Sequence, residues 1–199
     1  VWFLIGMDEH GQKVAQTAAE RGVAPQTLAD QVAEVFQQTW RDLYISHDQF
    51  IRTTSRPHHE GVRDLIEKIF ARNPDDFYER SYTGRYCVGC EAFKTDTDIV
   101  DGKCALHPTR TLEDVEERNW FFRLSAYGDR LLEHYERTPS AVEPDIRRNE
   151  VLSLIRGGLR DFSISRTNFD WGIPLPWDPD HVTYVWFDAL TNYLTGAGY

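Results

Sequence analysis

Two short segments, CVGC at residues 87–90 and CALH at residues 104–107, constrain the fold of this chain more than any other feature of its sequence. In each segment two residues separate the potential metal ligands, and thirteen residues lie between the segments. A tight turn between paired ligands lets both side chains point at one ion, and three thiolates with one imidazole form a tetrahedral set that zinc favours. The spacing therefore predicts one structural Zn2+ per chain, with no open coordination position, bound by Cys87, Cys90, Cys104 and His107.

The chain has three cysteines, and this odd number fits a metal site in a reducing compartment better than a disulfide framework. Iron in the same ligands, or a chance arrangement of ordinary cysteines and a surface histidine, remains an alternative. The longest apolar run, residues 1–5, is far shorter than the roughly 20 residues that span a bilayer, and no signal segment follows it. We therefore expect a cytoplasmic protein with no membrane partner.

Residues 1–76 alternate between strand-like and helix-like segments. Such alternation predicts an α/β fold with a mostly parallel sheet, in which ligands bind beyond the carboxyl ends of the strands. Asp8, Glu9 and His10 follow the first strand-like run and would lie at such an end. The expected elements are a strand at residues 1–5, a helix at 26–43, a strand at 48–53 and a helix capped by Ser55.

The pattern changes at Phe77, where aromatic, turn-rich sequence replaces the alternation. We expect an inserted subdomain at residues 77–160, between two parts of the main domain at residues 1–76 and 161–199. The further expected elements are helices around residues 131–135 and 151–155, strands at 162–166 and 182–187, and a helix from Asp188.

Several side chains have the chemistry of a binding pocket, each with a plainer alternative. Asp8 could meet an ammonium group, although an aspartate in this position is commonly a helix cap. Arg166, at a strand end, could donate two hydrogen bonds to a carboxylate or phosphate, or form a surface salt bridge. Strand alternation would put Tyr184, Trp186 and Asp188 on one face. An aromatic wall there could pack against a thioether, or it could be ordinary core.

Seven segments are characteristic in combination, although any one of them alone would be weak. They are FLIGMDEHGQK (3–13), FIRTTSRPHHEGV (50–62), YCVGCEAF (86–93), NWFFRLSAY (119–127), RRNEV (147–151), FSISRTNFDWGIPLPWD (162–178) and HVTYVWFDALTNYLTG (181–196). In this order they resemble the methionyl-tRNA synthetase family of class I aminoacyl-tRNA synthetases, over essentially the whole chain.

The resemblance implies a Rossmann-type nucleotide-binding domain interrupted by a zinc-binding connective insertion. It implies a ligase of protein biosynthesis that activates methionine with ATP and Mg2+ and transfers it to tRNA(Met). By similarity, Asp8 would bind the methionine ammonium group, and Arg166 would lie near the methionine carboxylate and the ATP phosphates. His10 belongs to this site region with no assigned role, and no catalytic residue is assigned. The methionine side chain would be enclosed by Trp186, Ala189, Leu190 and Tyr193.

Some features depart from the family pattern. The HIGH-type and KMSKS-type sequences that bind ATP are absent from these residues, and the chain opens with Val1 and closes with Tyr199 abruptly. We therefore expect a chain cut at both ends that is inactive alone. Met7 stands where the family has a small polar residue. The net charge of −10 means that contact with RNA would need local basic clusters. A non-catalytic, synthetase-derived zinc module that binds RNA or protein is the alternative function.

Overall fold

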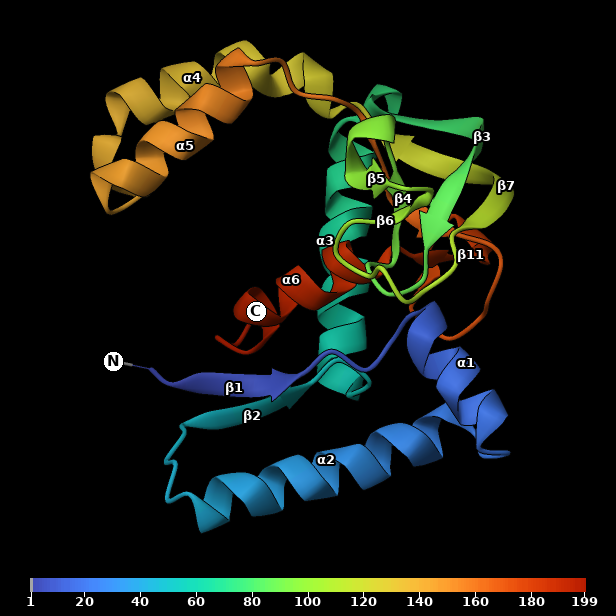
Figure 1. Ribbon diagram of the computed structural model, residues 1–199. Coiled ribbons are helices and arrows are strands. Elements are labelled where there is room, and N and C mark those ends of the chain that lie inside the picture. The colour runs from blue at the N-terminus through green and yellow to red at the C-terminus, as the bar shows by residue number, and fades with distance from the viewer. Residues whose placement is uncertain (1) are drawn as a thin grey trace.

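The first part of the chain forms a parallel β-α-β unit (Figure 1). The computed structural model describes residues 2–199, so Val1 lies outside the described residues. Two helices connect the parallel strands, and a third helix follows the second strand. The elements are β1 (Leu4–Met7), α1 (Gln12–Glu20), α2 (Pro25–Asp42), β2 (Gln49–Arg52) and α3 (Arg56–Arg72).

The sequence predicted most of this unit. The helix expected at residues 26–43 is α2, which starts with Pro25 in its first turn and buries Leu28, Ala29 and Ala33 at helical spacing. The strand expected at residues 48–53 is β2. Ser55 occupies the N-cap position of α3, but its side chain makes no capping hydrogen bond.

The chain from Phe77 forms an antiparallel sheet with the strand order β4-β3-β7-β8. Its centre is a long hairpin in which Phe77 pairs with Phe122 and Tyr86 pairs with Glu113. A small hairpin of two further strands carries part of the Cys/His group. The elements are η1 (Pro74–Asp76), β3 (Phe77–Cys87), β4 (Ala92–Lys94), η2 (Asp96–Asp98), β5 (Ile99–Val100), β6 (Lys103–Cys104), β7 (Glu113–Phe122) and β8 (Phe162–Ser163).

A helical hairpin leaves this sheet after β7 and returns to it at β8. Figure 1 shows α4 and α5 side by side, projecting away from the strands. Both helices cover the residues for which the apolar spacing predicted them. The elements are η3 (Leu124–Tyr127), α4 (Gly128–Arg137), η4 (Pro139–Ala141) and α5 (Asp145–Arg156).

The last part of the chain differs from the prediction. The strand expected at residues 182–187 is instead the end of β11, and helix α6 begins at Val185. Tyr184 is the helix N-cap, and its carbonyl oxygen accepts hydrogen bonds from the N–H groups of Phe187 and Asp188. Short apolar runs fit strand and helix equally well, and here burial of the helix against α3 decides. The elements are β9 (Ser165–Arg166), β10 (Pro174–Leu175), β11 (Asp178–Thr183) and α6 (Val185–Thr195).

The strand pairing also corrects the predicted sheet. Within residues 2–199, β1 and β2 are the one parallel pair, and all other paired strands are antiparallel. The expected mostly parallel sheet is therefore wrong for the described residues, although the α/β class is right. The physical reason is local: residues 77–122 can pair as hairpins, which need no helical crossover.

One apolar core joins the three parts of the chain. Ile66 of α3, Phe77 of β3, Ile164 and Leu175 of β10 are buried together. Around them, the rings of Phe70 and Trp177 stack with their centroids 4.1 Å apart. The antiparallel sheet therefore starts from the same core that fixes α3. None of the helices described in residues 2–199 has the length and apolar character needed to cross a membrane.

Candidate functional site

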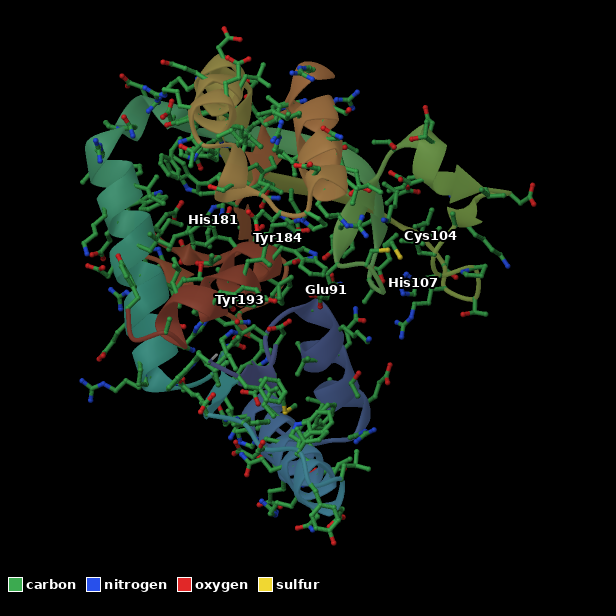
Figure 2. All side chains as sticks on the ribbon, turned by 90° about the vertical axis from the view of Figure 1, so that its left-hand side faces the viewer. Glu91, Cys104, His107, His181, Tyr184 and Tyr193 are labelled. Carbon is green, nitrogen blue, oxygen red and sulfur yellow. The ribbon has the colours of Figure 1, made fainter. Side chains whose placement is uncertain are left out.

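The four predicted metal ligands lie together. The ligand atoms of Cys87, Cys90, Cys104 and His107 are all within 4.8 Å of one another, and this group could bind a metal ion. The Sγ atoms of Cys90 and Cys104 are 3.6 Å apart, and the Nδ1 atom of His107 is 3.2 Å from the Cys90 Sγ atom and 3.7 Å from the Cys87 Sγ atom. Figure 2 shows Cys104 and His107 facing the same point in the loops beyond β3.

Backbone turns explain this convergence. The N–H group of Cys90 donates to the carbonyl oxygen of Cys87, and that of His107 donates to the carbonyl oxygen of Cys104, each at 3.1 Å. Gly89 lies under the His107 ring, where an added Cβ atom would be 2.7 Å from two ring carbons. Burial alone would raise the pKa of Cys104, but nearby donors, including the N–H group of Leu106, lower it to about 6. A thiolate, the form that binds metal, is therefore favoured at Cys104.

A cavity of about 380 Å³ adjoins this group. Its wall combines the loop after β1, one face of α1 and α2, the start of α6 and the turn after Cys87. Three carboxylates, one imidazole, one ammonium and the guanidinium of Arg21 therefore share a mainly apolar cavity. Its polar or functional lining residues include Asp8, Glu9, His10, Lys13, Cys90, Glu91 and Trp186.

Asp8 lies at the carboxyl end of β1, on the cavity wall. It is not a helix cap, because the N-cap of α1 is Gly11. The Nδ2 atom of Asn192 donates to its Oδ1 atom over 3.5 Å. Burial, together with the charge of Asp188, raises the pKa of Asp8, and the Asn192 hydrogen bond opposes this. A cation in the cavity would relieve that penalty, so Asp8 is suited to bind an ammonium group.

His10 belongs to a buried network that the sequence did not reveal. The Oδ2 atom of Asp188 is 2.6 Å from His10 Nδ1, and its Oδ1 atom is 2.7 Å from His58 Nε2. An ionised carboxylate can only accept, so both imidazole nitrogens donate to it. Thr195 completes the chain with 2.8 Å between its Oγ1 atom and His58 Nδ1. Burial alone would raise the pKa of Asp188, but the two histidine hydrogen bonds lower it.

The network fixes the loop after β1 to α3 and α6. Asp188 is 1% exposed, and the sequence indicated it only as the start of a helix and as a neighbour of Tyr184 and Trp186 on one strand face. His58 is fully buried, and its sole sequence signal is the adjacent pair of histidines at the start of α3. On the other side of the loop, Trp171 Nε1 donates to the carbonyl oxygen of Glu9 at 2.6 Å. The backbone that carries Asp8 is therefore held from two directions.

Arg166 is buried beside the same region but does not line the cavity. One of its terminal nitrogens donates to the Ser163 hydroxyl and to the Ser165 carbonyl oxygen, at 2.8 and 2.7 Å. The guanidinium lies 4.2 Å from the centre of the Tyr184 ring. Its Nε atom has no hydrogen-bond partner among the described residues. Arg166 thus carries a positive charge at a fixed position. It does not form the surface salt bridge that was the alternative interpretation of its sequence position.

The residues expected around an apolar ligand lie on two sides of α6. Trp186 and Ala189 line the cavity. Leu190 and Tyr193 do not, and they are 59% and 67% exposed. Strand alternation had grouped Trp186 with Asp188, but in the helix Trp186 is 49% exposed whereas Asp188 is buried. The structure therefore brings Asp8, His10, Trp186 and Ala189 together, while Leu190 and Tyr193 face outward.

Comparison with known proteins shows to which family a chain with this site is similar. The family model described as "tRNA synthetases class I (M)" matches residues 1–114 and 97–199. A methionine–tRNA ligase of Caldanaerobacter subterraneus is 47% identical over 199 residues, which are the whole of this chain and 31% of that protein. One from Mycobacterium tuberculosis is 51% identical over 202 residues, covering 38% of its length. The chain thus spans about a third of the length of the curated relatives that it matches.

Solved structures agree with the sequence comparison. The crystal structure of M. tuberculosis methionyl-tRNA synthetase bound by methionyl-adenylate matches this chain with a TM-score of 0.88 and 50% identity. The match covers all of this chain and 40% of that one. An apo form of the same enzyme matches 87% of this chain with a TM-score of 0.72. The chain belongs to the methionyl-tRNA synthetase family of class I tRNA synthetases.

Proposed function

We propose that this chain is the central part of a methionine–tRNA ligase, which activates methionine with ATP and transfers it to tRNA(Met). The observation that carries the proposal is the cavity, in which Asp8 meets Trp186 and Ala189 from the other end of the chain. The names of the relatives, methionine–tRNA ligases at 42–51% identity over this chain, support the same reaction. In this proposal, residues 1–76 and 161–199 belong to a Rossmann-type catalytic domain and residues 77–160 to its connective insertion.

The cavity chemistry suits methionine. The Asp8 carboxylate would accept hydrogen bonds from the ammonium group, and Trp186 would pack against the thioether with Ala189 below it. Arg166, whose Nε donor has no partner among the described residues, would contribute positive charge toward the methionine carboxylate and the phosphates of Mg2+-bound ATP. Attack of that carboxylate on the α-phosphate gives the adenylate, and catalysis would depend mainly on positioning and charge stabilisation. Leu190 and Tyr193 would complete the wall only if the ligand extends to the outer side of α6.

The Cys/His group fits a structural zinc ion. In a tetrahedral site with Zn–S bonds of about 2.3 Å, neighbouring sulfur atoms are about 3.8 Å apart. The 3.6 Å between the Sγ atoms of Cys90 and Cys104 agrees with that geometry. Because a Zn–N bond is shorter than a Zn–S bond, a sulfur and a nitrogen ligand should lie slightly closer, and the Nδ1 atom of His107 is 3.7 Å from Cys87 Sγ and 3.2 Å from Cys90 Sγ. Four protein ligands leave no position for a substrate, so the ion would stabilise the insertion and take no part in the reaction.

Methionine binding to the full-length protein tests the proposal. We expect Asp8→Asn to weaken binding of methionine at least about tenfold, measured by calorimetry, because the charged partner of the ammonium group is lost. An analogue without the amino group should bind the two proteins equally, which isolates the contact. The matched control is Asp114→Asn, at an exposed aspartate of β7. Wild-type protein that does not bind methionine would favour the non-catalytic zinc module, and unchanged binding by Asp8→Asn would refute the role of Asp8.

A further inference from the structure

Glu91 links the Cys/His group to helix α1. It follows Cys90 directly and has a φ angle of 51°, in the left-handed region that is uncommon for residues other than glycine. This turn directs its side chain away from the metal ligands and toward the first turn of α1 (Figure 2). There the Oε1 atom accepts a hydrogen bond from the N–H group of Lys13, 78 residues earlier in the chain, at 2.9 Å.

Helix α1 has no cap of its own. Its N-cap residue is Gly11, and no acidic side chain lies in its first turn. The first N–H groups of a helix have no partner within the helix, and a side chain at the N-cap usually accepts from the second or third of them. Lys13 is the second residue of α1, so Glu91 supplies the missing cap from another part of the chain. A Cβ atom at Gly11 would come within 2.5 Å of the Glu91 carboxylate oxygens.

The same contact borders the cavity. Gly89, Cys90 and Glu91 line it on one side, and Asp8, His10 and Lys13 line it next to them. Gly11, which precedes the capped turn, comes directly after His10. Its N–H group donates to the carbonyl oxygen of Trp171 at 3.2 Å. Glu91 and Trp171 thus both hold the carboxyl end of the loop that carries Asp8 and His10, and a shift of Glu91 would remove one of these two contacts.

We propose that Glu91 is a positioning residue that couples metal binding in the insertion to the substrate cavity. An ion held by Cys90 fixes the turn that contains Glu91, the Glu91 carboxylate fixes the first turn of α1, and this turn fixes the loop at residues 8–11. The expected effect of Glu91 on methionine binding rests on the proposed function. The coupling of the Cys/His group to helix α1 through Glu91 does not depend on it.

Amide hydrogen exchange in the full-length zinc-bound protein tests the coupling directly. We expect Glu91→Ala to accelerate exchange in the first turn of α1 about fivefold to tenfold. Glu91→Gln, which keeps an acceptor oxygen, should retain most of the protection. The control is Glu116→Ala, at an exposed glutamate of β7 in the same insertion. Equal protection of α1 in wild type and Glu91→Ala would overturn the proposal.

Removal of the metal provides the second half of the test. A zinc chelator should accelerate exchange in α1 of the wild-type protein but add little in Glu91→Ala, because the link is already broken. Equal acceleration by the chelator in both proteins would overturn the coupling. So would loss of zinc from Glu91→Ala, since Glu91 would then act on the metal site itself.

Methionine affinity then separates this proposal from the proposed function. Glu91→Ala should raise the Kd for methionine about threefold to tenfold while zinc content stays at one per chain, and Glu91→Gln should restore it. An unchanged Kd in Glu91→Ala would overturn the link to the cavity. Wild-type protein that binds no methionine, but shows the expected exchange pattern, would contradict the proposed function and leave the coupling supported.

Discussion

Asp188 shows how a single buried charge depends on its partners. Its carboxylate is 1% exposed and accepts from His10 on one oxygen and from His58 on the other. A buried carboxylate without such donors would be strongly unfavourable. With them, it joins the loop after β1, helix α3 and helix α6 at one point, directly beside the cavity.

We expect Asp188→Asn to lower the free energy of unfolding by about 2–4 kcal/mol. The amide has almost the same shape, but its NH2 group would face one of the two imidazole donors. Urea unfolding at neutral pH measures the change. Asp114→Asn, at an exposed position, should differ from wild type by less than about 0.5 kcal/mol. If Asp188→Asn lowered the free energy of unfolding no more than this control does, the Asp188 carboxylate would not be needed for stability.

The pH dependence of stability should carry the signature of Asp188. Its folded-state pKa is lowered, so its ionised form stabilises the fold above the unfolded-state pKa of about 3.9, and this contribution disappears as the pH falls through the folded-state pKa. The pKa of Asp8, the other carboxyl group nearby, is raised in the folded state, so protonation of Asp8 at low pH favours the folded state instead of destabilising it. Between about pH 5 and pH 3, urea unfolding should therefore show a smaller loss of stability in Asp188→Asn than in wild type. Parallel pH profiles would contradict this.

Gly89 should be essential for metal affinity although it is not a ligand. A methyl group there would displace the His107 ring, since the added Cβ would be 2.7 Å from it. We expect Gly89→Ala to weaken zinc binding about 10–100-fold, as loss of outer-shell support commonly does. Competition with a chromogenic chelator measures this. Gly128→Ala is the control because nothing lies within 4 Å of its added Cβ, and similar affinities for the two variants would show that His107 can adjust.

At the scale of elements, the contact of α3 with α6 decides where the cavity residues lie. Gly61 allows the two helices to approach closely, because a Cβ there would overlap the Cγ2 atom of Thr195. The same Thr195 holds His58 through its hydroxyl group. The packing and the buried network therefore share one residue, and a change in helix separation would be transmitted to Asp188.

We expect Gly61→Ala to cost about 1–3 kcal/mol of stability by overpacking this contact. Adding Thr195→Ser removes the overlapping methyl group but keeps the hydroxyl, so the double variant should recover most of the loss. Urea unfolding of wild type, the two single variants and the double variant forms a complete cycle. Additive effects in that cycle would show that Gly61 and Thr195 do not restrict each other.

At the scale of the whole molecule, large apolar side chains are exposed over the N-terminal unit and α6. An exposed apolar surface commonly marks an interface with another part of a protein or with a partner. The chain covers only 30–38% of the length of its curated relatives. The exposed side chains include Trp2, Phe3, Val35, Phe36, Leu43, Tyr44, Trp186, Leu190 and Tyr193.

These 199 residues alone should show no methionine-dependent exchange of pyrophosphate into ATP. The reason is that both ATP-binding signature sequences of the family are absent from them, so the α-phosphate would not be positioned for attack. A radiolabelled pyrophosphate exchange assay, with the full-length protein as the positive control, measures the difference. Detectable turnover by the 199-residue chain would contradict the prediction.

The sequence by itself determined the features that depend on neighbouring residues. The two Cys/His segments could be recognised because each pair of ligands sits in one tight turn. Helix α2 could be recognised because apolar residues repeat at intervals of three and four, at Leu28, Val32, Val35, Phe36, Trp40 and Leu43. The family could be recognised from ordered segments along the whole chain.

Only the tertiary structure decided the features that depend on distant contacts. Residues 185–187 are helical because α6 packs on α3, whereas their local pattern fits a strand equally well. Asp188 meets His58 across 130 residues, and Glu91 meets Lys13 across 78. No local spacing encodes such pairs, because folding of the intervening chain brings them together and burial makes their hydrogen bonds necessary.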